Sequence, residues 1–73
     1  ELTKNEYRIL QCLLENVGKV VSRDSIMEKL WENEAFVDDN TLTVNVTRLR
    51  RKLEDAGVSD YIRTKKGVGY IIS

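Results

Sequence analysis

The segment TLTVNVTRLRRKL, residues 41–53, fits two incompatible kinds of secondary structure. Its first seven residues alternate polar and apolar side chains, which is typical of a half-buried strand. Its last six residues are good helix formers. Whether the segment is one helix or a strand followed by a helix decides the fold class of the whole chain.

The apolar spacing favours one helix. The apolar positions recur after four, three, four and three residues, which keeps them on one helix face for over three turns: Leu42, Val46, Leu49, Leu53 and Ala56. A strand would require the alternation to continue, and it fails from Arg48 onward. Asp39 is the expected N-cap and Gly57 the expected stop. The sequence therefore predicts a helix over about 40–56.

A second helix is predicted at the start of the chain. Thr3 followed by Glu6 is a capping box, in which each side chain bonds the backbone N–H of the other residue. The apolar residues expected to face inward share one side of this helix, flanked by Ile9 and Tyr7: Leu10, Leu13, Leu14 and Val17. Gly18 is expected to end the helix in a left-handed conformation. Cys12 lies off this stripe, and we expect it to be an incidental thiol.

The remaining segments predict a third helix, a short strand and a hairpin. KVVS is a short strand at best, and Ser22 caps the helix RDSIMEKLW. Its inward side chains are expected to be Ile26 or Met27, Leu30 and Trp31. Two β-rich runs, 61–65 and 70–72, flank the glycines of KKGVG and predict a hairpin. The expected fold class is α+β, with three helices, a short strand and a C-terminal β-hairpin.

Length and composition restrict the remaining possibilities. With 73 residues the chain forms one domain, 1–73, and its opening without Met suggests that an upstream domain is missing. One cysteine and no histidine exclude an internal disulfide and a Cys/His metal cluster, so no cofactor is expected. No apolar run approaches the ~18 residues of a membrane span. We expect a reducing, cytoplasmic setting and no membrane partner.

The distribution of charge is uneven, although twelve basic and twelve acidic residues give a net charge of zero. Residues 28–39 contain five acidic residues and one basic residue, whereas residues 48–66 contain seven basic and three acidic residues. A field that changes sign along a small domain indicates a local binding surface that the total charge does not reveal.

The predicted outer face of the helix over 40–56 suits a DNA major groove. It carries Val44, Arg48, Arg51 and Asp55, with Thr43 and Thr47 on one flank. Valine and threonine cost helix stability, but their methyl groups can touch thymine, while arginine can bond guanine through two acceptors. A solvated basic helix face is the alternative explanation. The hairpin tip weighs against it, because Lys65 and Lys66 next to Gly67 form a narrow basic element suited to a minor groove.

Two motifs, V-x-x-L-R-x-K-L in 46–53 and T-x-x-G-x-G-Y in 64–70, make the entire chain resemble a known family. It is similar to the winged-helix effector domain of OmpR/PhoB-type response regulators. The resemblance implies a transcription factor for double-stranded DNA, with one helix in the major groove and the hairpin, or wing, in the adjacent minor groove. It also implies a missing N-terminal sheet, a receiver domain phosphorylated by a cognate histidine kinase, and a dimer on DNA when full-length. A fragment of this kind is expected to be a monomer. The segment DNTLTVNV, residues 39–46, is similar to the corresponding segment of regulators that respond to peptide antibiotics acting on the cell envelope.

The resemblance also assigns roles to individual residues. Base contacts fall on Val44, Thr47 and Arg48. Contacts to the DNA backbone or minor groove, including the basic residues inferred above, are expected from Arg23, Trp31, Thr41, Arg50, Arg51, Thr64, Lys65, Lys66 and Tyr70. The acidic loop ENEAFVDD, residues 32–39, matches a segment that touches RNA polymerase in some members, and its contact residues would be Glu32, Glu34 and Asp38. Asn40 and Thr47 stand where many members have arginine.

Two other classes of function remain as alternatives. A winged helix can serve as a protein-interaction module that contacts RNA polymerase without reading bases, and the acidic loop fits that role. An enzyme is the weakest hypothesis, because Cys12 has no evident base and KGVG lies in a hairpin rather than before a helix.

Overall fold

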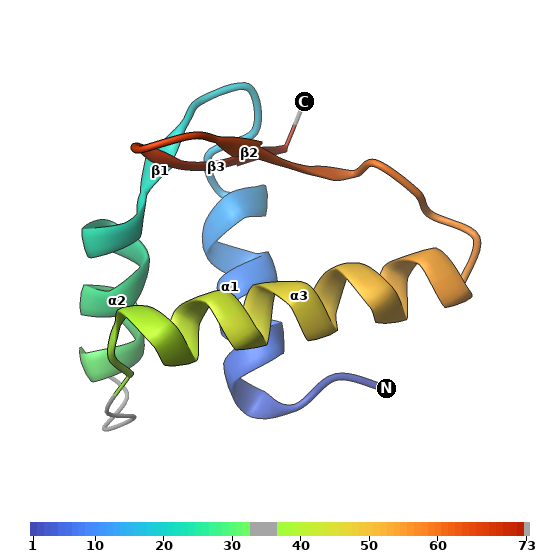
Figure 1. Ribbon diagram of the computed structural model, residues 1–73, viewed down its shortest axis with the longest axis horizontal. Coiled ribbons are helices and arrows are strands. Elements are labelled where there is room, and N and C mark those ends of the chain that lie inside the picture. The colour runs from blue at the N-terminus through green and yellow to red at the C-terminus, as the bar shows by residue number, and fades with distance from the viewer. Residues whose placement is uncertain (33–36, 73) are drawn as a thin grey trace.

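The computed structural model describes residues 1–32 and 37–72, in which three helices are followed or interrupted by three short strands. The elements in chain order are α1 Lys4–Leu14, β1 Val21–Ser22, α2 Arg23–Glu32, α3 Asp39–Asp55, β2 Ile62–Lys65 and β3 Gly69–Ile72. Figure 1 shows α3 starting beside the C-terminal end of α2 and crossing α1, with the sheet at the C-terminal end of α1 and the N-terminal end of α2. The predicted α+β fold is confirmed. Within the described residues, no helix combines the length and apolar character needed to cross a membrane.

The predicted capping box starts α1. The backbone N–H of Thr3 donates to Glu6 Oε1 at 2.9 Å, and the N–H of Glu6 donates to Thr3 Oγ1 at 3.2 Å. The helix ends at Leu14, earlier than predicted, because the Asn16 side chain donates to the Cys12 carbonyl at 2.8 Å and closes the last turn. Gly18 has a φ of +84°, as expected, but it lies in the following turn, where its N–H donates to Ile72 O at 2.7 Å.

The predicted inward face of α1 is partly wrong. The buried residues of α1 are Glu6, Ile9, Cys12 and Leu13. Leu14 and Val17 are 44% and 54% exposed, although both were expected in the core, and Cys12 is only 6% exposed. The helix has apolar residues on two sides, so its periodicity does not decide which side packs inward. Cys12 fills the core as a small hydrophobic residue, and burial raises the pKa of its thiol.

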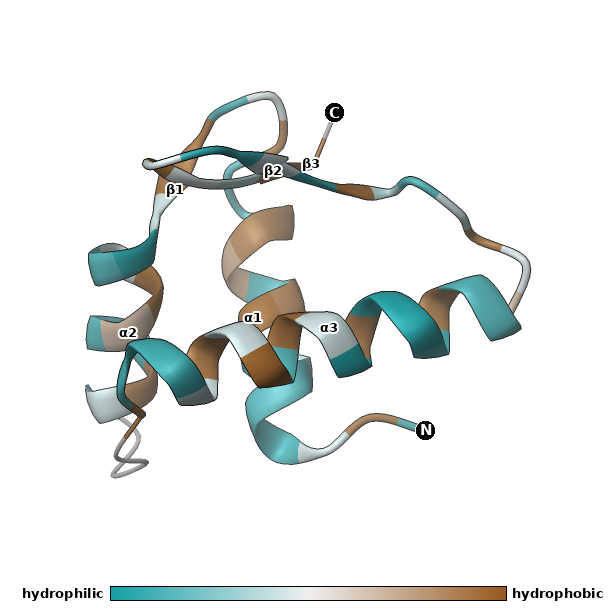
Figure 2. Ribbon diagram, viewed as in Figure 1, coloured by the Kyte–Doolittle hydropathy of each residue, from teal (hydrophilic) through white to brown (hydrophobic). Residues whose placement is uncertain are grey.

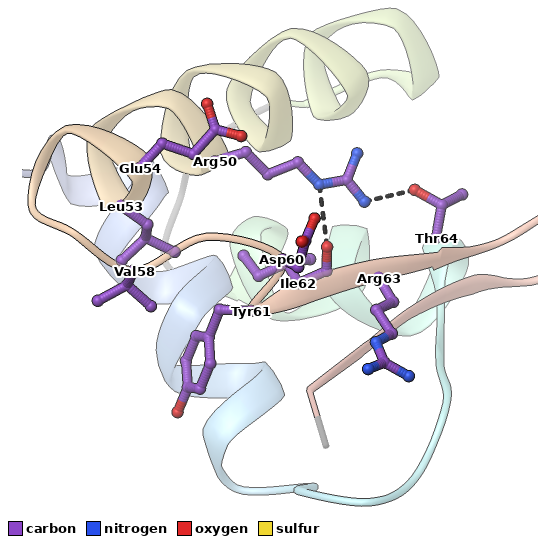
Figure 3. A pocket seen from close by; sticks show the side chains of 9 residues that line it. All are labelled: Arg50, Leu53, Glu54, Val58, Asp60, Tyr61, Ile62, Arg63 and Thr64. Atoms are coloured by element: carbon purple, nitrogen blue, oxygen red, sulfur yellow. Dashed lines mark hydrogen bonds between the residues drawn. The ribbon is translucent and has the colours of Figure 1, made fainter.

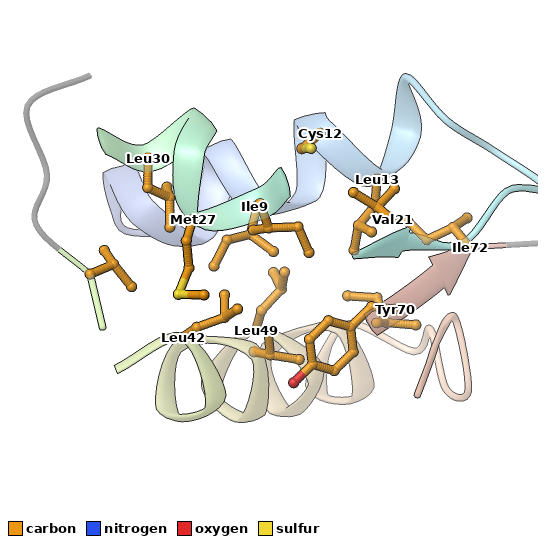
Figure 4. Packing of buried hydrophobic residues seen from close by; sticks show 14 residues of the cluster. Ile9, Cys12, Leu13, Val21, Met27, Leu30, Leu42, Leu49, Tyr70 and Ile72 are labelled. Atoms are coloured by element: carbon orange, nitrogen blue, oxygen red, sulfur yellow. The ribbon is translucent and has the colours of Figure 1, made fainter. Parts of the chain in front are cut away.

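One hydrophobic core joins the helices to the sheet (Figure 4). It contains Ile9, Cys12, Leu13, Val21, Ile26, Met27, Leu30, Val37, Leu42, Val46, Leu49, Ile62, Tyr70 and Ile72. In α2, Leu30 is buried as predicted, and both Ile26 and Met27, which the sequence offered as alternatives, are buried as well. The expectation was wrong for Trp31, whose side chain is 47% exposed while its ring N–H donates to Val37 O at 3.0 Å. An indole with its N–H bonded can lie at the edge of a core with one face in water.

Residues 39–55 form the single helix predicted from the apolar spacing. Leu42, Val46 and Leu49 are buried. Figure 2 shows hydrophobic residues recurring along α3 between hydrophilic ones. The N-cap is Asp38 rather than Asp39, because Asp38 Oδ1 accepts the backbone N–H of Thr41 at 2.8 Å. With two adjacent aspartates, local pattern alone does not distinguish the cap from the first helical residue.

The predicted hairpin is confirmed, and the short strand before α2 joins it in a sheet of order β1-β3-β2. Register pairs Ile62 with Ile72 and Lys65 with Gly69. Gly67 provides the turn with a φ of +78°. Gly69 has a different role, because a Cβ at this position would lie 1.9 Å from the Val21 carbonyl oxygen. The close pairing of β1 with β3 therefore requires glycine at this position.

Candidate nucleic-acid interface

The outer face of α3 presents the residues that the sequence predicted. Burial of Leu42, Val46 and Leu49 turns the opposite side of the helix to solvent. The side chains exposed on that side are Thr43, Val44, Thr47, Arg48, Arg51 and Asp55. Val44 is 44% exposed, so its methyl groups are accessible at the surface of the helix. An apolar and cationic surface is therefore available along the first three turns.

The threonines of this face have their hydroxyl hydrogens occupied. Thr47 Oγ1 donates to the Thr43 carbonyl at 2.9 Å, and Thr43 Oγ1 donates to the Asp39 carbonyl at 3.3 Å. Such bonds to the carbonyl four residues earlier hold the side chain in one rotamer. The Thr47 side chain is exposed on the same outer face as Val44.

The tip of the hairpin is a second exposed element. Lys65, Lys66, Gly67 and Val68 are all exposed, and the N–H of Val68 donates to Lys65 O at 2.9 Å to close the turn. The backbone N–H of Arg23, the first residue of α2, donates to Val68 O at 3.2 Å. Backbone bonds from two sides therefore hold the tip in place.

Among the described residues, four cations on these two elements have no internal partner. Within residues 1–32 and 37–72, no hydrogen bond or ion pair engages the side chains of Arg48, Arg51, Lys65 and Lys66. Unpaired, exposed cations are available to polyanions, and they lie on the outer face of α3 and at the hairpin tip.

Arg23, in contrast, lies inside a network. Its Nε donates to Asp39 Oδ1 at 2.9 Å, and its Nη2 donates to the Asp39 carbonyl and to Thr43 Oγ1, both at 2.7 Å. Its Nη1 donates to the Tyr70 hydroxyl at 2.6 Å. Burial lowers the pKa of Arg23, but the bond to Asp39 and the Tyr70 hydroxyl outweigh it, so that the pKa is raised.

Arg50 connects α3 with the hairpin (Figure 3). Its Nε donates to Ile62 O at 3.2 Å, and its Nη2 donates to Thr64 Oγ1. Its guanidinium lies 5.6 Å from the centroid of the Tyr70 ring. Tyr70 is buried, with 4% of its surface exposed. Three predicted backbone contacts, Arg50, Thr64 and Tyr70, are thus brought together by bonds within the protein. A hollow of about 500 Å³ lies between the end of α3 and β2, and Arg50 and Thr64 are among the residues that line it (Figure 3).

The other predicted contact residues surround the start of α3. Trp31 is half-exposed at the end of α2, and Thr41 is exposed in the first turn of α3. In the acidic loop, Glu32 and Asp38 are exposed, while Glu34 lies outside the described residues. Asp38 is occupied as the N-cap, and the bond from Thr41 lowers the pKa of its carboxyl.

Three residues with structural roles in or near this region were not recognised from sequence patterns. Asp39 was expected to be a cap, yet it pairs with Arg23. Asn45 was unassigned, yet it is buried and its side chain donates to Thr41 O at 2.8 Å. Lys52 was counted only as a charge, yet it pairs with the buried carboxylate of Glu6. No local sequence pattern marks these ion pairs, because Arg23 and Asp39 are 16 residues apart and Glu6 and Lys52 are 46 residues apart.

The arrangement offers two exposed elements, the outer face of α3 and the hairpin tip, that suit the grooves of an anionic surface. Across the described residues, no group of three histidine, cysteine, aspartate or glutamate side chains lies close enough together to hold a metal ion. The exposed side chains instead combine a methyl-bearing helix face with unpaired arginine and lysine, the combination that reads base edges and phosphates.

Comparisons with known proteins identify similar chains. The family model described as "Transcriptional regulatory protein, C terminal" matches residues 1–72. A sensory transduction protein named BceR, from Halalkalibacterium halodurans, is 54% identical over 71 residues, which are 97% of this chain and 31% of that protein. The chain thus spans about a third of the length of the curated relatives that it matches.

Two solved structures are similar in fold. The C-terminal domain of the nisin resistance regulator NsrR, a lantibiotic response regulator, has a TM-score of 0.88 and 52% identity, over 97% of this chain and 72% of that one. The DNA-binding domain of the response regulator AdeR, in complex with an intercistronic region, has a TM-score of 0.83 and 29% identity, over 100% of this chain and 74% of that one.

Proposed function

Because the chain belongs to the family of C-terminal domains of transcriptional regulatory proteins, the effector domains of OmpR/PhoB-type response regulators, we propose that it binds double-stranded DNA sequence-specifically. In this proposal α3 enters the major groove and the β2–β3 hairpin enters the adjacent minor groove. The function is binding and involves no catalysed reaction. We prefer DNA binding to the alternative function, a module that contacts other proteins without reading bases. Relatives in this family are DNA-binding domains, and one of them was solved in a complex with DNA.

The observation that carries the proposal is the set of unpaired cations on two adjacent elements. Arg48 and Arg51 lie on the outer face of α3, and Lys65 and Lys66 lie at the hairpin tip. Arg23 bonds both to Val68 at that tip and to the first turn of α3, so the two elements are neighbours. In Figure 1 the start of α3 and the hairpin tip both lie toward the left of the molecule.

Within the major groove, the proposed roles follow side-chain chemistry. Arg48 bonds a guanine through its O6 and N7 acceptors, while Val44 and the Thr47 methyl group contact the methyl group of thymine. Arg51 contacts a phosphate group. Thr41 and Trp31 contact the backbone of the same DNA strand near the start of α3. Lys66 enters the minor groove, where the negative potential attracts a cation, with Lys65 beside it.

The proposal extends to the whole regulator of which such a domain is a part. A receiver domain phosphorylated by a cognate histidine kinase would control the effector domain, and the full-length protein would bind DNA as a dimer in the bacterial cytoplasm. Glu32 and Asp38, exposed near the start of α3, are the proposed contacts to RNA polymerase. Similarity to a lantibiotic response regulator supports a response to cell-envelope peptide antibiotics.

The test is a selection of duplexes from a random pool by the 73-residue chain, followed by titration of the selected duplex and a shuffled duplex of equal composition. We expect one enriched motif and a higher affinity for the selected duplex. Absence of enrichment, or equal affinity for both duplexes, would refute the proposal. Binding to polymerase subunits that survives neutralisation of Arg48, Arg51 and Lys66, with no duplex preference, would establish the protein-interaction function instead.

A further inference from the structure

Arg23 bonds to both elements of the proposed reading surface. Its backbone N–H donates to Val68 O in the hairpin tip at 3.2 Å. Its Nη2 donates to the carbonyl oxygen of Asp39 and to the hydroxyl oxygen of Thr43, each at 2.7 Å, and its Nε donates to Asp39 Oδ1 at 2.9 Å. One residue at the start of α2 therefore joins the hairpin tip to the first turns of α3.

Few donors of this guanidinium remain for a ligand. A guanidinium has five N–H donors, and the structure shows four bonds from it, the fourth from Nη1 to the Tyr70 hydroxyl at 2.6 Å. The side chain is 25% exposed, and its centre lies 5.7 Å from the centroid of the Tyr70 ring. A phosphate approaching Arg23 would also meet the carboxylate of Asp39, which is 74% exposed.

We infer that Arg23 is a positioning residue, which sets the orientation of α3 relative to the hairpin, rather than a contact to DNA phosphate. This inference depends on the proposed function. A helix and a hairpin that read neighbouring grooves must reach both at once, so a change in their mutual orientation removes base contacts. The phosphate contact proposed for Arg51 carries no sequence information, so it contributes to binding of the selected and the shuffled duplex alike.

Positioning and phosphate binding predict different responses to salt and to DNA sequence. A phosphate contact adds about 0.9 to the magnitude of the slope of log K against log salt concentration, on any duplex. A positioning residue leaves that slope unchanged and lowers only the ratio of the affinities for the selected and shuffled duplexes. The Arg23–Asp39 ion pair is already formed in the free protein, so it releases no counterion from DNA.

The first experiment titrates Arg23→Lys and Arg23→Gln with a duplex selected by the wild-type chain and with its shuffled counterpart, between 50 and 200 mM salt, roughly the range over which such slopes are resolved. We expect both variants to lose about tenfold in affinity for the selected duplex, the equivalent of one base contact. Affinity for the shuffled duplex and the salt slope should stay unchanged. Equal losses on both duplexes, or full retention by Arg23→Lys with a lower slope for Arg23→Gln, would overturn the inference.

A second pair of variants gives opposite signs for the two roles. If Arg23 positions α3, Asp39→Ala lowers the ratio of selected to shuffled affinity. If Arg23 binds phosphate and Asp39 masks it, Asp39→Ala raises both affinities and steepens the slope, which would refute positioning. Asp55→Ala, at an exposed aspartate near the end of α3, is the matched control for removal of one negative charge.

Tyr70→Phe keeps the test decisive if the arginine variants fail to fold. It removes the acceptor of the Nη1 bond and retains the ring, which is 4% exposed in the core. A lower ratio of selected to shuffled affinity than in the wild type, with an unchanged salt slope, supports positioning. The same ratio as in the wild type contradicts it. If the wild-type chain selects no duplex at all, the proposed function fails before the role of Arg23 is reached, so the two failures are distinguishable.

Discussion

The carboxylate of Glu6 lies 2.6 Å from the ammonium group of Lys52 and joins the first turn of α1 to the last turns of α3. Glu6 is 1% exposed, whereas the side chain of Lys52 is 36% exposed. The same carboxylate oxygen accepts the Thr3 N–H of the capping box at 2.9 Å. Within the described residues, the other oxygen, Oε2, is buried without a hydrogen-bond partner. Glu6 therefore relies on one oxygen for both of its stabilising interactions.

Lys52→Met should destabilise the fold by about 2 kcal/mol, because it leaves a buried carboxylate without its cation. The aliphatic part of the side chain is retained, so lost packing contributes little. Urea denaturation followed by circular dichroism measures the change in the free energy of unfolding. Arg51→Met is the matched control on the neighbouring exposed position and should stay within about 0.5 kcal/mol of wild type. Equal stability of both variants would show that the ion pair contributes nothing.

The stability of the chain should depend on pH through Glu6. Burial alone would raise the pKa of Glu6, but the bonds from Lys52 and Thr3 outweigh burial, so the pKa is lowered from its usual value of 4.5. The unfolded chain therefore binds the proton more readily, and the stabilisation is present above pH 4.5 and is lost as the pH falls through the lower folded value. Denaturation midpoints from pH 7 to pH 3 measure this loss. In Glu6→Gln that component should be absent, and a curve parallel to wild type would contradict the assignment.

Arg48→Ala should cost about 1–3 kcal/mol in binding to the selected duplex and relax the preference at one base pair. The guanidinium is exposed on the outer face of α3, so the fold should be unaffected. Titration against duplexes changed at each position measures both effects. Arg51→Ala is the control on the same face, and it should weaken all duplexes alike. A uniform loss for Arg48→Ala as well would remove its base-reading role.

Lys66→Ala should weaken binding to selected and shuffled duplexes by similar factors. Its ammonium group at the hairpin tip is proposed to lie in the minor groove, attracted by the negative potential there and making no bond to a base edge. The slope of log K against log salt should fall in magnitude by about 0.9, the value for one lost contact. Lys4→Ala, at an exposed lysine in the first turn of α1, should leave the slope unchanged. The same slope for both variants would place Lys66 outside the interface.

Gly69→Ala should destabilise the fold by about 3 kcal/mol, through overpacking against the backbone of β1. The added Cβ would lie 1.9 Å from the Val21 carbonyl oxygen, so β1 and β3 must separate. Gly67→Ala is an informative comparison, because Gly67 has a φ of +78° but nothing within 4 Å of an added Cβ. It should cost only about 1–2 kcal/mol, the penalty of a left-handed conformation. Thermal unfolding of both variants shows which substitution destabilises the fold more. A larger destabilisation by Gly67→Ala would contradict the steric explanation.

Local pattern in the sequence determined the elements and the outer face of α3. The apolar spacing from Leu42 to Leu53 identified one helix across a segment that begins like a strand, because side chains three and four residues apart share a helix face. The same spacing placed Val44 and Arg48 in solvent. The glycines of KKGVG and the pairing of Thr3 with Glu6 likewise act within a few residues of each other, so the hairpin and the start of α1 were predictable.

Only the tertiary structure decided which groups meet across the chain. The inward side of α1 includes Cys12 because the helix packs against α2 and α3, and an apolar stripe on two sides of one helix does not specify that choice. Arg23 and Arg50 had been predicted as phosphate contacts, yet both bond within the protein, to partners between 12 and 47 residues away. Charge and hydrogen-bonding capacity are properties of single residues that sequence displays. Which partner satisfies them depends on distances that exist only after the helices and the sheet have packed.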